Sequence, residues 1–449
     1  MRLTKVACFI ALILTYPFFV NGQVKFKNLQ YQAALQKAAK DGKLLFVFVP
    51  TPDCVVCKDI TLKNFSDAAL SDKIAKDFIA ITLSTKDISY TTLTDHFDRA
   101  NTGGILFIGP KGNVLHQLAY NSSTSKEYIK ACDKAISNKA GMDSLEVLTK
   151  EYNAGNTDIT FLETYINKRI DLGLDIDDLL DEYATLVPKD SLMSSYRINS
   201  FIMEHVSIYG SSADDAWHTS KSMYKEVWYR TDRKVRSAVN KRVRIKSMAK
   251  AVKEKNDNYA LRVIRAFTEG NSIKKSKTAQ KNYSLYCADY YWAVRDTQSY
   301  IYNAKIYIDQ YINNVLLDSI RAWDKRQIEK TTANVDSLND SVEVPTQTFA
   351  KFYASTLNQH AWNFYKAAKK STDLRNASYW SLKSLELEEN EGLYWDTYAR
   401  LLYVLGDKIK AIDAEKKAID LVTKKGYSYT AEDFKKVLKN MQSNKTTID

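Results

Sequence analysis

The stretch Gly42-Lys43-Leu44-Leu45-Phe46-Val47-Phe48-Val49-Pro50 is followed, after three intervening residues, by Cys54-Val55-Val56-Cys57. An unbroken apolar run of this length, bounded by glycine and proline, predicts a buried β-strand over 44–49. The C-x-x-C spacing brings two sulfurs together across one helical turn, and we expect a helix over 54–62. The stretch therefore predicts a buried strand that is followed by a cysteine pair at the start of a helix.

Strand and helix signals alternate around this stretch as far as about residue 140. Helices are predicted over 31–40, 68–78, 90–100 and 125–138, and further strands over 78–83, 104–108 and 113–118. The last two strands are joined by Gly109-Pro110-Lys111-Gly112, a hairpin turn signal. This order of strand, helix, strand, helix, hairpin and helix predicts an α/β domain over residues 23–140.

Residues 1–22 have the pattern of a secretory signal peptide. Arg2 and Lys5 form a positive start, and the apolar run from Val6 to Val20 is short for a membrane-spanning helix. We therefore expect a cleaved signal and a periplasmic or otherwise exported protein that starts near Gln23. No later segment is apolar enough to cross a membrane, so we expect no integral membrane segment in the mature chain.

Beyond residue 140, strand signals disappear and helical periods follow one another. We expect an irregular helical-repeat region over 141–348 and tetratricopeptide-like repeats over 349–449, closed by a capping helix over 430–441. Pairs of residues recur at the tetratricopeptide period of 34, namely Asp373 and Asp407, Ala377 and Ala411, and Ser384 and Ala418. The small residues Ala411 and Ala418 are expected to let paired helices approach closely.

The net charge of +12 raises the question of nucleic-acid binding. The densest basic run, residues 230–255, alternates with apolar residues as on one amphipathic helix. A solvated helix face explains this pattern better than a phosphate-binding patch. We expect no nucleic-acid partner.

The cysteine pair is the strongest chemical signal in the chain. At a helix start, unpaired N–H groups stabilise a thiolate, so Cys54 is the expected nucleophile and Cys57 the resolving thiol. A zinc site needs a second ligand pair, and the sequence has no other C-x-x-C, no C-x-x-H and no H-x-x-x-H. We expect no metal and no cofactor, whereas a purely structural disulfide between Cys54 and Cys57 stays open as an alternative.

Residues 31–138 resemble the thioredoxin superfamily, closest to the exported branch that includes the periplasmic domain of the transmembrane disulfide reductase. That branch typically shows GK, an apolar strand, C-V-x-C-K and F-S-D. This chain has Gly42-Lys43, Cys54-Val55-Val56-Cys57-Lys58 and Phe65-Ser66-Asp67. The whole arrangement, with helical repeats after such a domain, is similar to exported proteins common in Bacteroidota. The resemblance implies an α/β thioredoxin-like domain followed by an all-α, tetratricopeptide-like region.

The chain also departs from the family pattern around the cysteines. The residues expected to shape the site are Asp53, Val55, Val56, Thr102 and Gly103. Asp53 replaces the usual aromatic residue, and its negative charge is expected to raise the pKa of Cys54. Phe48 replaces an often-present buried aspartate, and Thr102-Gly103-Gly104 replaces the cis-proline loop. Together these differences predict either a sluggish or specialised redox site or a fold retained as a binding module.

These observations are consistent with two alternative functions. The first is an exported thiol–disulfide oxidoreductase, or a thiol-carrying redox partner, that acts on protein disulfides of exported clients while its helical repeats select the client or partner. The second is a non-enzymatic protein-interaction scaffold whose thioredoxin-like domain is redox-inactive. The sequence favours the first, because an isolated C-x-x-C in an exported chain is rarely kept without redox use.

Overall fold

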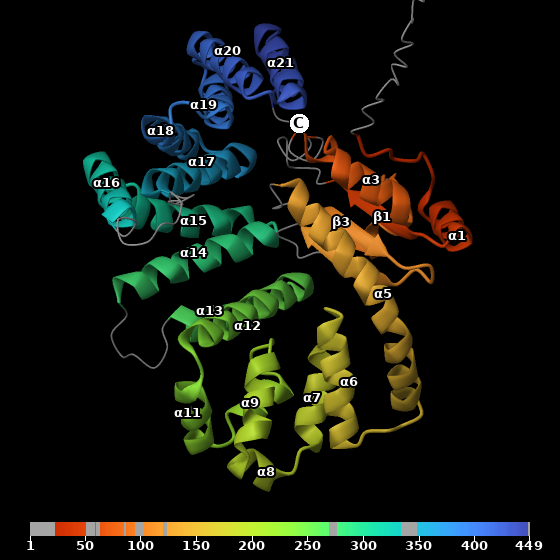
Figure 1. Cartoon of the computed structure of the whole chain (residues 1–449). Coiled ribbons are helices and arrows are strands. Elements are labelled where there is room, and N and C mark those ends of the chain that lie inside the picture. Colours follow the sequence, from red (N-terminus) through yellow and green to blue (C-terminus); the bar gives the residue numbers. More distant parts are fainter. Residues whose placement is uncertain are drawn as a thin grey trace, which may run out of the picture. The chain divides into compact units, whose positions relative to one another are not determined.

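The computed structural model describes residues 23–50, 59, 63–84, 87–94, 103–119, 124–268, 276–333 and 348–447. The chain divides into two compact units (Figure 1). The sheet unit contains the described residues up to Pro50, those between Thr61 and Thr94, and Gly103–Ser137. The helical unit contains Asp59 and the described residues from Asn138 onward.

The sheet unit follows the predicted order of elements. Its described elements are α1 (Tyr31–Asp41), β1 (Leu44–Val49), α3 (Ala68–Asp77), β2 (Phe78–Thr82), α4 (Ser89–Thr94), β3 (Gly104–Ile108), β4 (Val114–Ala119) and the first half of α5 (Ser125–Asn153). The predicted strands 44–49 and 104–108 are confirmed at both ends. Within the helix predicted over 54–62, the structure describes Asp59 alone. Residues 95–100 of the helix predicted over 90–100 also lie outside the described part.

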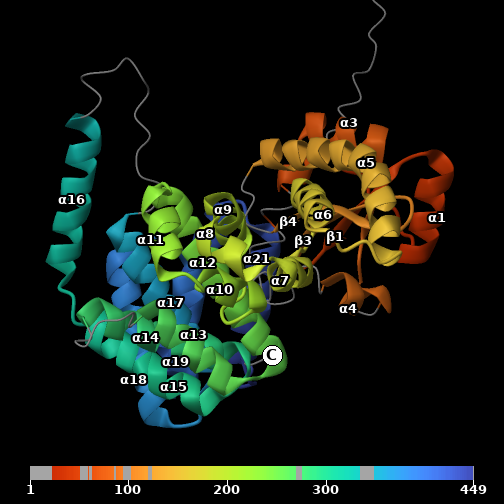
Figure 2. The same cartoon turned by 90° about the horizontal axis from the view of Figure 1, so that it is seen from below.

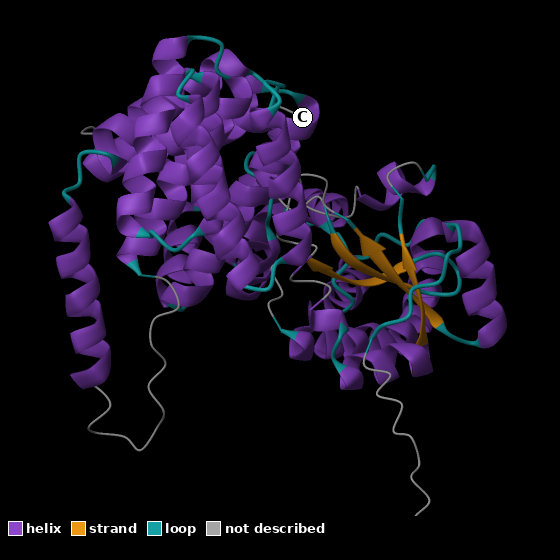
Figure 3. Ribbon diagram, turned by 90° about the horizontal axis from the view of Figure 1, so that it is seen from above, coloured by secondary structure: helices purple, strands orange, loops and turns teal. Residues whose placement is uncertain are grey.

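The four strands form one mixed sheet in the order β2-β1-β3-β4 (Figure 3). β1 pairs parallel with β2 and antiparallel with β3, and β3 pairs antiparallel with β4. The side chains of Leu45, Phe46 and Val47 are fully buried, as an apolar run in a central strand requires. The rings of Phe65 and Phe107 pack edge-on against Phe46, with centroids 5.8 and 5.5 Å away.

Local capping sets the ends of two helices in this unit. α1 stops at Gly42, whose φ of 67° is the left-handed conformation that glycine adopts most readily. α3 starts after Asp67, whose carboxylate accepts a hydrogen bond from the Leu70 amide at 2.9 Å. The same carboxylate accepts a hydrogen bond from the Ser125 hydroxyl at 2.9 Å, which links the starts of α3 and α5.

Helix α5 is longer than the sequence predicts, because it continues past Asn138 to Asn153. Gly141, in its interior, marks a close approach: a Cβ there would lie 2.7 Å from Cδ2 of Leu172. The Asn138 side chain also donates a hydrogen bond to the Leu172 carbonyl, at 3.4 Å. The polar and glycine residues near 140 therefore accommodate Leu172 and do not end the helix.

The helical unit contains no strand among its described residues, as predicted. Its helices after α5 are α6 (Ile159–Asp171), α7 (Asp177–Leu186), α8 (Lys189–Ser194), α9 (Tyr196–His205), α10 (Ser212–Trp217), α11 (Lys221–Arg230), α12 (Arg233–Glu254), α13 (Asp257–Thr268), α14 (Lys277–Ala293), α15 (Thr297–Tyr307), the π-helical turn η1 (Ile308–Ile312), α16 (Leu317–Ala333), α17 (Phe349–Ala367), α18 (Ser371–Leu387), α19 (Gly392–Val404), α20 (Lys408–Lys424) and α21 (Ser428–Gln442). Neighbouring helices pack in pairs such as α17 with α18 and α19 with α20. Helix α16 extends away from the other helices of this unit (Figure 2).

The last helices repeat, but with a longer period than the 34 residues that the sequence predicts. α18 and α20 are both 17 residues long; they begin at Ser371 and Lys408 and end at Leu387 and Lys424, so their bounds recur every 37 residues. Ala411 and Ala418 are completely buried, which agrees with the expectation that small residues at these positions let paired helices approach closely.

Asp373 and Asp407, which are 34 residues apart, do not have equivalent positions in their helices. Asp373 lies inside α18, where its buried carboxylate pairs with Lys305 at 3.1 Å. Asp407 is the N-cap of α20 and accepts a hydrogen bond from the Lys410 amide. The two residues therefore occupy different positions in their helices.

The boundary predicted between residues 348 and 349 does not coincide with a break in packing. Tyr300 and Ile308, before the boundary, share one hydrophobic core with Leu357, Phe364 and Trp380, after it. The helices from α14 to α19 contribute to this core. The irregular helices and the repeats thus stabilise each other, as two repeats alone cannot bury a core.

Among the described helices, none combines the length and the apolar character that crossing a membrane requires. The predicted signal peptide, residues 1–22, lies outside the described residues.

Candidate functional site

Most of the predicted site residues lie outside the part of the chain that the structure describes. These are Cys54 and Cys57 together with Asp53, Val55, Val56 and Thr102. Gly103 and Phe48 are described, and so is Asp59, two residues after Cys57. The site is therefore built from the residues that flank the cysteine pair.

The chain reaches the cysteines from the carboxyl end of β1, which lies beside the start of β3. Val49 pairs with Gly104, and Phe48 pairs with Ile105. Gly103, just before β3, is buried. Gly104 has a φ of 149°, a conformation that residues with a side chain rarely adopt. The loop that the sequence analysis assigned to the site, at Gly103-Gly104, is thus next to the point where the chain leaves the sheet toward Cys54.

Phe48 makes this end of the sheet apolar. Its half-buried ring packs against Phe26 and Phe65, with centroid separations of 6.0 and 5.7 Å. A phenylalanine carries no exchangeable proton. Phe48 therefore cannot take part in proton transfer.

Asp59 is fixed by the last helix of the chain. Its carboxylate accepts hydrogen bonds from the Tyr429 amide at 3.2 Å, the Thr430 amide at 3.0 Å and the Thr430 hydroxyl at 2.7 Å. Asp59 and Thr430 are both buried, with 8% and 0% of their surface exposed. The residue at the N-cap position of α21, Tyr427, provides no side-chain hydrogen bond, so Asp59 caps this helix in its place.

Sequence reasoning missed Asp59. Capping rules look for the acceptor next to the helix that it caps, whereas Asp59 and Thr430 are 371 residues apart. The one hint was local: Tyr427 is not among the residue types that favour an N-cap.

The two isolated cysteines do not extend the site. Cys132 and Cys287 are free and buried. Burial raises the pKa of Cys132 to about 12 and that of Cys287 to about 11, so both stay protonated thiols at neutral pH. Within the described residues, no group of three or more potential metal ligands comes together.

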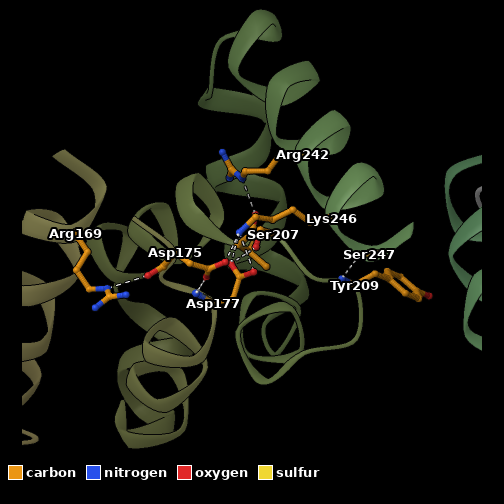
Figure 4. Close-up of polar contacts among 9 residues, drawn as sticks. Arg169, Asp175, Asp177, Ser207, Tyr209, Arg242, Lys246 and Ser247 are labelled. Carbon is orange, nitrogen blue, oxygen red and sulfur yellow. Dashed lines mark hydrogen bonds and ion pairs between the residues drawn. The ribbon is translucent and has the colours of Figure 1, made fainter. Parts of the chain in front are cut away.

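The basic helix α12 uses several of its cations inside the helical unit (Figure 4). Lys246 donates to the two carboxylate oxygens of Asp177, at 2.9 and 2.8 Å. Arg242 donates to the backbone carbonyls of Val206 and Glu204, at 3.1 and 2.6 Å. These groups are already engaged, which weakens the phosphate-patch interpretation of the basic run.

Other cations of α12 lie over aromatic rings. The Arg244 guanidinium lies 4.4 Å from the centre of the Tyr286 ring, and Arg236 lies 5.8 Å from that of Trp228. The basic run is therefore, in good part, a packing surface for the neighbouring helices.

Comparison with known proteins gives no further assignment, since no protein-family model and no curated protein matches this chain. The function is therefore inferred from the residues and their geometry.

Proposed function

We propose that this protein is an exported thiol–disulfide oxidoreductase, or a thiol-carrying partner of one, with a thioredoxin-like domain and tetratricopeptide-like helical repeats. One observation carries the proposal: the C-x-x-C pair begins at Cys54, five residues after Val49 ends β1, a central strand of a small mixed sheet. The strand order β2-β1-β3-β4, with β1 and β2 parallel and a terminal hairpin, is compatible with a thioredoxin-like domain.

The chemistry is a two-step disulfide exchange. The Cys54 thiolate attacks one sulfur of a client disulfide; a Cys54–client bond forms, and the other client sulfur leaves as a thiolate that takes a proton. Cys57, once deprotonated, attacks the Cys54 sulfur, forms the Cys54–Cys57 disulfide and releases the second client thiol. The client gains two electrons and two protons, and the dithiol loses them. A dithiol partner whose reduction potential is lower than that of the Cys54–Cys57 pair then regenerates the dithiol by the reverse exchange and is itself oxidised to a disulfide.

The helical repeats supply a surface for a client or partner. On α18, Tyr379 and Leu382 are 56% and 39% exposed although the opposite face of the helix carries the buried Trp380. Exposed apolar and aromatic side chains on stacked helices are suited to bind another polypeptide. We assign client selection to this region.

The test uses single cysteine variants of the whole mature chain. Cys57→Ser should trap clients as mixed disulfides on Cys54, and Cys54→Ser should abolish both trapping and the reduction of a test protein disulfide. Cys132→Ala, which removes a buried thiol elsewhere, is the matched control and should behave as the wild type. Trapping that persists in Cys54→Ser would contradict the assignment, and so would reduction that survives it.

The scaffold function has one observation in its favour, the apolar packing of Phe48 beside the site. It predicts that Cys54→Ser leaves partner binding intact, while polar replacement of Tyr379 and Leu382 together abolishes it. The redox function predicts loss of thiol chemistry in the first variant. The two candidates are separated by measuring both properties in both variants.

A further inference from the structure

Positive charge is concentrated in helix α11 and in the first turns of α12. Residues 221–241 contain seven basic and two acidic residues, against a net charge of +12 for the whole chain of 449 residues. Arg242 and Lys246, further along α12, are engaged inside the helical unit. Four basic side chains in the stretch are instead exposed and form no hydrogen bond or ion pair with another described residue, namely Lys221, Lys225, Arg233 and Lys234. Packing of the helices therefore leaves these four charges available to a partner.

The exposed residues of α11 share one face, and α12 begins beside it. Lys221, Lys225 and Tyr229 follow one another at intervals of four residues, so they lie in a row along the helix. The Tyr229 side chain protrudes, since the residue is 72% exposed. On α12, the Arg236 guanidinium lies 5.9 Å from the centre of the Tyr229 ring, and Arg233 is one turn before Arg236. The α11–α12 patch is defined as Lys221, Lys225, Tyr229, Arg233, Lys234 and Arg236.

Two arginines here already contact aromatic rings. Arg236 also lies over the ring of Trp228, 5.8 Å from its centre. Arg230 lies 5.6 Å from the centre of the Tyr196 ring and pairs with Glu226 at 3.1 Å. Three of the four free cations are consequently lysines. A lysine is a point charge on a flexible stem, which suits a diffuse negative surface better than the bidentate recognition of a single carboxylate.

The patch faces outward and is not part of a groove. Helix α11 packs on α9 and lies at the outer edge of this group of helices (Figure 1). Two hollows lined by described residues, one between α14 and η1 and the other beside Trp292, contain no residue of the patch. A broad surface can therefore approach the row of charges and the protruding ring together.

We propose that the α11–α12 patch binds the anionic headgroup surface of a lipid bilayer as a peripheral contact. The negative potential of such a surface attracts each lysine and arginine held close to it. Tyrosine side chains favour the boundary between headgroups and hydrocarbon, which is the position that the protruding Tyr229 ring would take. Charge and aromatic character thus match the same partner. The inference goes beyond the thiol chemistry and does not depend on it.

The experiment measures binding of the whole mature chain to vesicles by co-sedimentation. One set of vesicles is phosphatidylcholine alone, and the other is an equimolar mixture of phosphatidylcholine and phosphatidylglycerol. The protein should bind the mixed vesicles and not the neutral ones. The double variant Lys221→Gln, Lys225→Gln should bind the mixed vesicles about 30-fold more weakly, at about fivefold for each charge removed. Raising the ionic strength from about 0.1 to about 1 M should release the wild type, because the Debye length falls from about 10 to about 3 Å.

Matched variants separate the patch from net charge and from loss of structure. Lys369 and Lys370 are also exposed and form no side-chain hydrogen bond or ion pair with another described residue. Replacing both by glutamine removes the same charge elsewhere in the helical unit and should leave binding as in the wild type. Lys221→Arg with Lys225→Arg keeps both charges and should also bind as the wild type does. Tyr229→Ser should weaken binding by a smaller factor than the double glutamine variant, and Tyr229→Phe, which keeps the ring, should not.

Four outcomes would overturn the proposal. Equal binding to the neutral vesicles would show that anionic headgroups are not recognised. Equal losses in the two double glutamine variants would show that only net charge matters. Unchanged binding of the Lys221→Gln, Lys225→Gln variant to mixed vesicles would place the contact elsewhere. If the protein ignores vesicles but binds polyglutamate or duplex DNA through Lys221 and Lys225, the patch serves an acidic polypeptide or a nucleic acid instead.

Discussion

At the scale of single residues, the unusual feature is a buried charged cluster on α19 and α20. The Arg400 guanidinium is buried; its Nε donates to the Asp396 carboxylate at 2.9 Å and its Nη1 to the Thr447 carbonyl at 2.7 Å. Glu415 is completely buried beside this pair. Burial, with the negative charge of Asp396, raises the pKa of Glu415 well above its ordinary value, against the opposing effect of Arg400.

This shift predicts a pH-dependent stability. A carboxyl whose pKa is raised on folding stabilises the protein at pH values below its unfolded pKa, near 4, and that stability is lost as the pH rises toward the folded pKa. The free energy of unfolding should therefore fall from about pH 5 upward, by at most about 1.4 kcal/mol per pH unit from this group. Glu415→Gln should remove that part of the slope, as measured by urea unfolding at pH 5 and pH 8.

The control for this prediction is Glu432→Gln. Glu432 forms an exposed ion pair with Lys435, so its loss should change the stability by less than about 1 kcal/mol and leave the slope as in the wild type. An unchanged slope in Glu415→Gln would mean that Glu415 is ionised in the folded protein.

At the scale of elements, close approach between helices depends on residues that lack a side chain. Gly392 begins α19, and a Cβ there would lie 2.7 Å from Cγ1 of Val422 and 3.0 Å from the backbone oxygen of Ala418. Because a backbone oxygen in the middle of α20 cannot move aside cheaply, the pairing of α19 with α20 requires glycine at this position. At Gly141 the only atom closer than 3 Å is the end of the flexible Leu172 side chain.

We predict that alanine destabilises the protein at Gly392 but has little effect on stability at Gly141. Gly392→Ala should destabilise the helical unit by about 1–3 kcal/mol, because overpacking outweighs the gain in helix propensity. Gly141→Ala should stay within about 1 kcal/mol of the wild type, since Leu172 can change rotamer and alanine favours the helix. Thermal unfolding of both variants checks the contrast, and similar losses at both sites would refute it.

At the scale of the whole molecule, the helices depend on one another beyond the apparent repeats. The core shared by Tyr300, Leu357, Phe364 and Trp380 crosses the predicted boundary at residue 348. A fragment of residues 349–449 would therefore expose side chains that the intact chain buries against α14 and α15.

This organisation predicts how fragments behave. Residues 138–449 should fold with a cooperative thermal transition, because the fragment keeps the helices that share this core. Residues 349–449 should remain partly unfolded or aggregate, since half of the core is missing. Circular dichroism melting of the two fragments tests the prediction, and a sharp transition in the shorter one would show that the repeats are autonomous.

Much of the local architecture could be predicted because it depends on neighbours in the sequence. The apolar run 44–49 is a strand, Gly42 ends α1, and Asp67 caps α3, each for a reason contained within a few residues. The cysteine pair was likewise visible as a spacing. These features follow from periodicity, capping and turn chemistry, which act over one or two helical turns.

Tertiary structure alone decided which segment Asp59 contacts and which charges are engaged. The sequence does not reveal that Asp59 caps a helix 371 residues away, that Lys246 is held by Asp177, or that α5 continues through Gly141 against Leu172. Such contacts depend on how distant segments pack, and no local pattern records them. The strand and the two cysteines that follow it are thus written in the sequence, whereas the contact between Asp59 and α21 exists only once the chain has folded.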